Sequence, residues 1–213
     1  MRTPPARSVA RTAKLFVVSS PSGGGKTTLV AELLRQLRGV VRSVSVTTRP
    51  RRPVEQRDRD YRFVSREQFE RLRAQGALIE WAKVHQAYYG TPRAPVERAL
   101  ARGRDVILSI DVQGARQVRR RFGRRAALVF VMPPSMKDLK RRLLRRKTET
   151  RASLRRRLAA ARQELACGRW YDYHVVNRQV RQAVEHLKAI VVAERLRVTR
   201  SNVTGREDGT DIH

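Results

Sequence analysis

The stretch Leu15-Phe-Val-Val-Ser-Ser-Pro-Ser-Gly-Gly-Gly-Lys-Thr-Thr-Leu29 organises the rest of this 213-residue chain. It opens with an apolar run rich in β-branched residues, which is short enough for a buried strand. Three consecutive glycines and Lys26 follow, and then Leu29 and Leu33 begin an apolar stripe at helical spacing. A strand, a glycine-rich loop and a helix in this order predict a loop that binds phosphate groups.

The residues of this loop suit phosphate chemistry. Glycine lets the backbone turn its N–H groups inward around an anion, and the start of a helix adds unsatisfied donors. We expect the ammonium group of Lys26 to reach the terminal phosphates and the hydroxyl of Thr27 to bind Mg²⁺. The residues expected to contact the bound nucleotide here are Ser20, Pro21, Ser22, Gly23, Gly24, Gly25, Lys26, Thr27 and Thr28.

The strict phosphate-loop pattern G-x-x-x-x-G-K-[ST] is incomplete, because Ser20 stands where its first glycine belongs. The alternative interpretation is a glycine-rich turn beside an unrelated lysine. Gly25, Lys26 and Thr27 match the rest of the pattern. The flanking strand and helix are those that the pattern requires, so we interpret the stretch as a phosphate loop.

The charge of the chain is strongly positive, with 48 Lys and Arg against 19 Asp and Glu and a net charge of +29. Nucleic acid is one anionic partner that such a charge could serve. Anionic nucleotide substrates and an arginine-biased codon usage are simpler explanations, since the arginines run along the whole chain. We therefore expect no specific nucleic-acid partner.

The length fits one domain with inserted subdomains. A single cysteine, Cys167, excludes an internal disulfide and favours a reducing compartment, so we expect a cytoplasmic protein. No apolar run approaches the length of a membrane span, and the first residues lack the apolar region of a signal peptide. We expect no membrane partner.

Strand and helix patterns alternate along most of the chain. Buried strands are predicted at 105–111, 126–132 and 173–177, each followed by a helical pattern. Such alternation after a phosphate loop predicts an α/β fold, a P-loop NTPase core whose parallel sheet is flanked by helices on both faces. A strand is also predicted at 40–46.

The block from about residue 47 to residue 92 has a different composition and a different pattern of strands and helices. It begins with a charged, proline-punctuated loop and continues with a strand at 61–64 and a helix after a capping-box pattern at Ser65. A strand at 77–84 and a turn at 87–92 complete it. We interpret the block as a small α+β insertion.

Taken together, these blocks resemble the guanylate kinase family from about Lys14 to Arg197. The matching stretches are Ser45-Val-Thr-Thr-Arg-Pro-Arg-Arg52 with Tyr61, Glu80-Trp-Ala82, Tyr88-Tyr-Gly-Thr91, Ser109-Ile-Asp-Val-Gln-Gly114, Arg146-Lys-Thr-Glu149 with Arg157, and Val176-Asn177. The resemblance implies transfer of a phosphoryl group from ATP to GMP, with Mg²⁺, in purine metabolism. It also implies a P-loop core (14–46, 93–136 and 167–199), a GMP-binding insertion (47–92), a helical lid (137–166) and flexible ends (1–13 and 200–213).

The acceptor phosphate needs donors that grip its oxygens in pairs, which arginine provides better than lysine. By resemblance, Arg49, Arg52, Tyr61 and Tyr89 hold the phosphate of GMP, and Ser45 lies beside them. A solvated basic loop is the alternative. By the same resemblance, Asn177 contacts the adenine of ATP.

Guanine offers adjacent N–H donors on its Watson–Crick edge, and one carboxylate accepts both of them. The resemblance gives this role to Glu80, with Thr91 as its hydroxyl partner. Asp111 contacts either the guanine or the water around Mg²⁺, and these two roles stay open. Ser109 replaces a second acid that the family usually has, which leaves the water network around the metal undefined.

Catalysis of phosphoryl transfer rests on positioning and on charge stabilisation. We expect Lys26, Arg52, Arg146 and Arg157 to supply the charge. Two alternatives are a related interaction module without catalysis, which tends to lose the phosphate loop, and a kinase for another acceptor such as a phosphorylated sugar.

Four further departures from the family occur at Val54, Asp58, Gln86 and Arg178. Lost glycines in the insertion imply a changed loop conformation, and the oligomeric state is left open.

Overall fold

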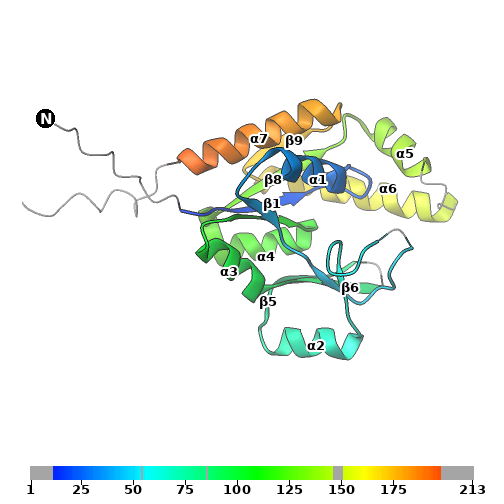
Figure 1. Cartoon of the computed structure of the whole chain (residues 1–213). Coiled ribbons are helices and arrows are strands. Elements are labelled where there is room, and N and C mark those ends of the chain that lie inside the picture. Colours follow the sequence, from blue (N-terminus) through cyan, green and yellow to red (C-terminus); the bar gives the residue numbers. More distant parts are fainter. Residues whose placement is uncertain (1–11, 54, 85, 146–150, 198–213) are drawn as a thin grey trace, which may run out of the picture.

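The computed structural model describes residues 12–53, 55–84, 86–145 and 151–197. Their strands form two sheets, one of five strands and one of four. Figure 1 shows the larger sheet between layers of helices and the smaller sheet beside it. Residues 146–150 of the predicted lid, Val54 and most of the predicted flexible ends lie outside the described residues.

The larger sheet is parallel throughout and has the order β2-β7-β1-β8-β9. Its strands are β1 (Leu15–Ser19), β2 (Val40–Arg42), β7 (Asp105–Ser109), β8 (Ala126–Met132) and β9 (Tyr173–Val176). The apolar run before the phosphate loop is therefore the central strand. All five of its residues are buried, as expected for a strand covered on both faces.

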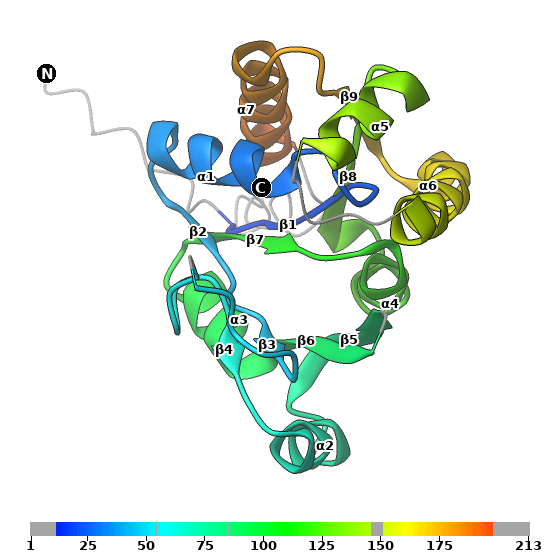
Figure 2. The same ribbon diagram turned by 90° about the vertical axis from the view of Figure 1, so that its right-hand side faces the viewer.

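Alternate residues of β1 face two different cores. Phe16 and Val18 pack with α1 (Lys26–Gln36) and α7 (Val180–Leu196) on one face, and Leu15 and Val17 belong to the core that includes α3 (Arg93–Ala101) and α4 (Val112–Phe122) on the other. Figure 2 shows the two helix layers above and below the sheet. The predicted α/β fold with helices on both faces is confirmed.

The smaller sheet has the order β4-β3-β6-β5, with β3 parallel to β4 and antiparallel to β6. Its strands are β3 (Val46–Thr47), β4 (Arg62–Phe63), β5 (Leu78–Val84) and β6 (Ala87–Pro92). Two predictions were wrong here. Residues 87–92 form a strand and not a turn, because they pair with both β5 and β3. The predicted strand at 40–46 is divided between the two sheets.

One helix of this region, α2 (Arg66–Ala74), begins at the predicted capping box. The hydroxyl of Ser65 accepts from the backbone N–H of Gln68 at 3.2 Å, and the side chain of Gln68 accepts from the backbone N–H of Ser65 at 3.0 Å. The buried Phe69 then anchors the helix on Val46 and Leu78 of the small sheet.

Two further helices, α5 (Met136–Leu144) and α6 (Arg151–Ala166), form a layer of their own with a small core of Leu139, Leu143 and Ala161. Short 3₁₀ turns, η1 (Gly123–Arg125) and η2 (Cys167–Trp170), complete the described structure. In the part of the chain that the structure describes, no helix is long and apolar enough to cross a membrane.

Candidate active site

The predicted phosphate loop connects the buried end of β1 to the first residue of α1. Gly23 and Gly25 have φ angles of 87° and 92°, in the left-handed region that glycine favours. Within the described residues, no side chain caps the start of α1. Its first N–H groups are therefore left for an external acceptor.

The back of this loop is braced by side chains from distant elements. The side-chain amide of Asn177 donates to the carbonyl of Gly24 at 2.9 Å, and the guanidinium of Arg142, on α5, donates to the carbonyl of Asn177 at 2.6 Å. Asn177 is 3% exposed. These contacts hold the loop, and the predicted contact of Asn177 with adenine stays a prediction.

Lys26 lies at the centre of the site. Its ammonium group donates to the carbonyl of Ile110 at 2.7 Å. Burial lowers the pKa of Lys26 to about 8, although the carboxylates of Asp111, Glu164 and Glu80 oppose that shift. A phosphate group at this position would restore the charge of the lysine.

Glu164 is a site residue that no sequence pattern indicated. It lies near the end of α6, and its carboxylate accepts from the backbone N–H of Ser22 in the phosphate loop at 3.3 Å. Burial raises the pKa of Glu164. The layer of α5 and α6, which the sequence predicts to be a lid, therefore touches the phosphate loop directly.

The phosphate loop opens into a cavity of about 300 Å³ that also reaches the small sheet. Its walls include Lys26, Thr27, Glu80, Tyr89 and Asp111. A neighbouring cavity of about 930 Å³ shares part of these walls and extends to the charged loop. The phosphate loop and the small sheet thus line the same cavity, and the charged loop lines its neighbour.

Glu80 lies on β5 and is 3% exposed. The hydroxyl of Thr91, on the neighbouring strand β6, donates to its Oε1 atom at 2.5 Å. Burial raises the pKa of Glu80 to about 7, against the effect of the Thr91 hydrogen bond. The predicted pair is therefore in contact, and it presents a desolvated acceptor to the cavity.

Asp111 follows β7 and caps α4, since its Oδ1 atom accepts from the backbone N–H of Gly114 at 2.9 Å. The side chain of Gln113 donates to the other carboxylate oxygen at 3.3 Å. The predicted strand at 105–111 ends at Ser109, and both Ser109 and Asp111 line the cavity.

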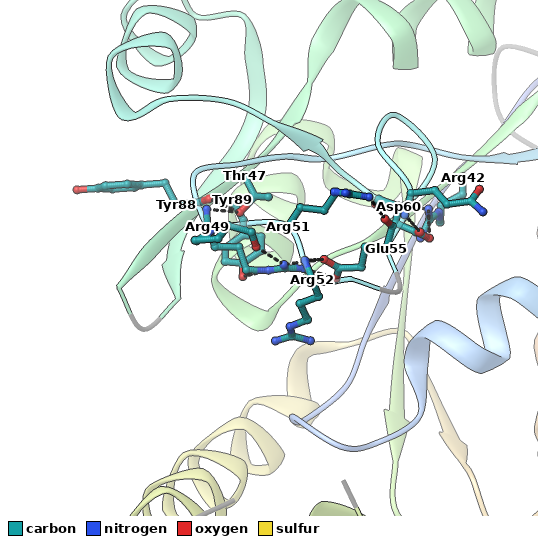
Figure 3. Close-up of polar contacts among 11 residues, drawn as sticks. Arg42, Thr47, Arg49, Arg51, Arg52, Glu55, Asp60, Tyr88 and Tyr89 are labelled. Carbon is teal, nitrogen blue, oxygen red and sulfur yellow. Dashed lines mark hydrogen bonds and ion pairs between the residues drawn. The ribbon is translucent and has the colours of Figure 1, made fainter. Parts of the chain in front are cut away.

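The predicted acceptor loop is held together by Glu55, a second residue that the sequence did not single out. Its carboxylate forms an ion pair with the guanidinium of Arg49 and accepts from the backbone N–H of Arg52 at 2.9 Å. Arg49 also donates to the phenol of Tyr89 at 3.1 Å and lies over the ring of Tyr61 at 5.1 Å. Figure 3 shows Arg49 directed to Glu55, whereas the side chain of Arg52 points away from it.

Both tyrosines stand beside these arginines. The rings of Tyr61 and Tyr89 meet edge to face, with centroids 5.9 Å apart. Burial raises the pKa of Tyr61, so its phenol stays protonated and able to donate. Ser45, Arg52 and Arg157 line the same cavity. The structure thus brings together the predicted acceptor-phosphate residues.

Asp58 occupies one of the positions where the sequence lacks an expected glycine. Its φ angle is 59°, in the left-handed region. Aspartate is one of the few residues other than glycine that adopt this conformation routinely. The loop therefore keeps a glycine-like backbone at this position.

The oxygen atoms near the phosphate loop suit Mg²⁺. Thr27 is exposed and lines the cavity, and Asp111 lines the same space. The described residues include no cluster of three metal-binding side chains. Mg²⁺ in kinases binds through one or two protein oxygens together with phosphates and water, so these residues fit it.

Comparisons with known proteins match most of the chain. The family model described as guanylate kinase matches residues 12–194. A guanylate kinase of Rhizobium johnstonii is 47% identical over 192 residues, which are 90% of this chain and 87% of that protein. A guanylate kinase of Desulfitobacterium hafniense is 48% identical over 186 residues, 87% of this chain and 92% of that protein. The crystal structure of guanylate kinase from Anaplasma phagocytophilum superimposes with a TM-score of 0.77 at 33% identity, over 93% of this chain and 98% of that one.

Proposed function

This chain belongs to the guanylate kinase family and is an ATP-dependent nucleoside monophosphate kinase that converts ATP and GMP to ADP and GDP; from that premise we propose how its own residues carry out the transfer. The observation that supports the proposal is the shared cavity. Lys26 of the phosphate loop and Glu80 of the small sheet line one space. Donor and acceptor would meet between them.

The acceptor is held at both ends. The carboxylate of Glu80 accepts from the N1–H and N2–H₂ donors of guanine, while Thr91 holds its Oε1 atom. At the other end, Arg49, Tyr61 and Tyr89 donate to the phosphate of GMP. Adenine presents an acceptor at N1, which would face the Glu80 carboxylate without a hydrogen bond.

The donor is held by the phosphate loop. The first N–H groups of α1 and the ammonium group of Lys26 bind the terminal phosphates, and the phosphate charge returns the pKa of Lys26 toward its usual value. The binding of ATP by this enzyme would therefore take up a proton above about pH 8.

Mg²⁺ would be held by the hydroxyl of Thr27, and Asp111, which lines the same cavity, would order its water shell. When bound, it neutralises charge on the phosphate oxygens of ATP. Around it, Lys26 orients the phosphates, and Arg52 and Arg157 approach the transferred group from the acceptor loop and from α6. These residues supply positioning and charge, which phosphoryl transfer chiefly requires.

One assay tests the proposal: release of ADP from ATP with GMP, dGMP, AMP, UMP and CMP as acceptors. We expect kcat/KM to be highest for the guanine nucleotides, because only guanine offers two adjacent donors to Glu80. An equal or higher value for AMP would contradict the proposed base recognition. The cytoplasmic location expected from the lone cysteine stays a prediction.

A further inference from the structure

We propose that the inner face of α4, through Gly114 and Gln117, positions the carboxylate of Glu80 and so sets how strictly the enzyme selects guanine. This inference rests on the proposed role of Glu80 and extends it to a helix of the core. Figure 2 shows α4 beside β5, between the two sheets. The two residues are three positions apart and lie on the same side of the helix.

Gln117 holds the backbone on which Glu80 stands. Its Oε1 atom accepts from the backbone N–H of Trp81 at 3.1 Å, and its Nε2 atom donates to the carbonyl of Trp81 at 2.5 Å. That N–H belongs to the peptide bond that joins Glu80 to Trp81. The amide thus fixes the two peptide planes on either side of the α-carbon of Trp81, and the first of these planes adjoins the α-carbon of Glu80.

These two hydrogen bonds from Gln117 are needed because β5 is an edge strand. The outward backbone groups of an edge strand have no neighbouring strand to pair with. The side chain of Gln117 takes the place of that strand at one residue, and it comes from the core. The position of Glu80 is thereby tied to the helix that Asp111 caps beside the phosphate loop.

Gly114 provides the space for the carboxylate. A Cβ atom added at this position would lie 2.2 Å from the Oε2 atom of Glu80 and 3.0 Å from its Cδ atom. The φ angle of Gly114 is not in the left-handed region, so alanine can adopt this backbone. The clash would therefore displace the end of the Glu80 side chain and leave the helix intact.

These two contacts matter because readout of guanine needs both carboxylate oxygens. Thr91 fixes Oε1, and the glycine leaves room for Oε2. IMP has the N1–H group of GMP but lacks the 2-amino group, so the ratio of kcat/KM for GMP to that for IMP reports the second hydrogen bond. A displacement of about 1 Å in a bound group can change a rate by about 10²-fold.

The test compares Gly114→Ala and Gln117→Met with the wild-type enzyme. We expect each substitution to raise the KM for GMP and to lower the GMP-to-IMP ratio at least about fivefold, with the KM for ATP unchanged. Alanine is a better helix former than glycine. The melting temperature of Gly114→Ala should therefore stay the same or rise while its selectivity falls, which a loss of fold would not produce.

Val118→Ala is the matched control. Val118 lies on the same helix and is fully buried in the core cluster that includes Ile79 of β5, but its apolar side chain makes no hydrogen bond to that strand. This control should lower the melting temperature and leave the GMP-to-IMP ratio unchanged. Folded Gly114→Ala and Gln117→Met enzymes with the wild-type ratio would overturn the inference.

Glu80→Gln separates this inference from the proposed function. If Glu80→Gln loses selectivity and the two α4 variants do not, the base is read by Glu80 but α4 does not position it. If Glu80→Gln also keeps the wild-type ratio, the proposed base recognition itself is wrong.

Discussion

The buried carboxylate of Glu80 combines a folding cost with the binding role that we propose for it. Burial favours its protonated form, and the hydrogen bond from Thr91 offsets that effect only in part. A carboxylate that is desolvated before the substrate arrives gains most from donors that the substrate brings. Glu80 is therefore the residue at which single-atom changes should have the clearest consequences.

We predict that Glu80→Gln lowers kcat/KM for GMP by about 5- to 160-fold, which corresponds to the roughly 1–3 kcal/mol of a buried group left without its partner. The amide replaces one acceptor oxygen with a donor that faces a guanine N–H. The KM for ATP should change little. Steady-state kinetics with each substrate varied in turn would check this, and an unchanged value for GMP would show that Glu80 does not read the base.

The pH dependence of GMP binding should follow the carboxylate of Glu80. Because its pKa is about 7, the ionised form that accepts two hydrogen bonds predominates above pH 7, and the protonated form predominates below it. We expect the affinity for GMP, measured calorimetrically without ATP, to fall between pH 8 and pH 6. Glu80→Gln should show a flatter profile, and identical profiles would assign the titration to another group.

The same raised pKa predicts the sign of a stability difference. Between the unfolded pKa of 4.5 and about 7, the folded state binds more protons than the unfolded state, so the contribution of Glu80 to stability decreases as the pH rises. The melting temperature of Glu80→Gln relative to the wild type should therefore be higher at pH 8 than at pH 5. At pH 8 it should come close to the wild-type value or exceed it. This result would also show that its kinetic defect is not caused by unfolding.

At the scale of elements, α5 and α6, the helices of the predicted lid, both contribute to the support of the phosphate loop. Arg142 of α5 braces the loop from behind through Asn177, and Glu164 of α6 contacts the N–H of Ser22. Both contacts join residues that are far apart in the chain. The loop is thus held by the layer that would close over the donor.

We predict that Arg142→Met raises the KM for ATP about tenfold, because the phosphate loop loses the support that holds Asn177 and Gly24. The KM for GMP should be much less affected. Arg141→Met is the control, since Arg141 is exposed and its partner is Asp138 in the preceding turn. Equal effects of the two substitutions on ATP would contradict a specific role of Arg142.

Arg157 of α6 lines the cavity opposite the acceptor loop, where a transferred phosphoryl group would pass. Arginines that meet this group in other phosphoryl-transfer enzymes contribute about 10³–10⁵ in rate. We predict that Arg157→Met lowers kcat and kcat/KM together by at least the lower part of that range, with little change in the affinity for GMP. Arg157→Lys should restore little of the lost activity, because lysine lacks the planar guanidinium group that donates paired hydrogen bonds to a phosphate.

Single-turnover transfer with saturating ATP and GMP would measure this loss directly. A loss below about tenfold would mean that Arg157 does not act on the transition state. The same prediction applies to Arg146, which lies outside the described residues.

At the scale of the whole molecule, the net charge of +29 extends well beyond the active site. No acidic residue occurs from residue 112 to residue 137. The exposed arginines of α4 and η1 are Arg116, Arg120, Arg121, Arg124 and Arg125. These five exposed arginines place a high density of positive charge on a short part of the chain.

We predict that this surface binds duplex DNA weakly and without sequence preference. If about five phosphates are contacted, the logarithm of the binding constant should fall with the logarithm of salt concentration with a slope of about −4 to −5, through counterion release. Titration of a labelled duplex at low and at physiological salt would measure the slope. Tight, sequence-selective binding that survives physiological salt would show a nucleic-acid function.

Local patterns in the sequence determined the parts of this protein that depend on neighbouring residues. The glycines after β1 predicted the phosphate loop, the Ser65 capping box predicted the start of α2, and the alternation of strand and helix predicted the parallel sheet. Each of these follows from backbone preferences or hydrophobic periodicity within a short window. The residues of the candidate site were recognised because they occur in stretches that resemble a family.

Only the tertiary structure decided features that depend on which distant segments meet. Residues 87–92 carry turn-forming glycine and proline, yet they form β6 because two strands pair with them. The hydrogen bonds of Gln117 with Trp81 join residues 36 positions apart. The contact of Glu164 with Ser22 joins residues 142 positions apart. The raised pKa of Glu80 likewise arises from burial by several elements at once. Strand pairing, desolvation and long-range hydrogen bonds are properties of the packed chain, so no local pattern encodes them.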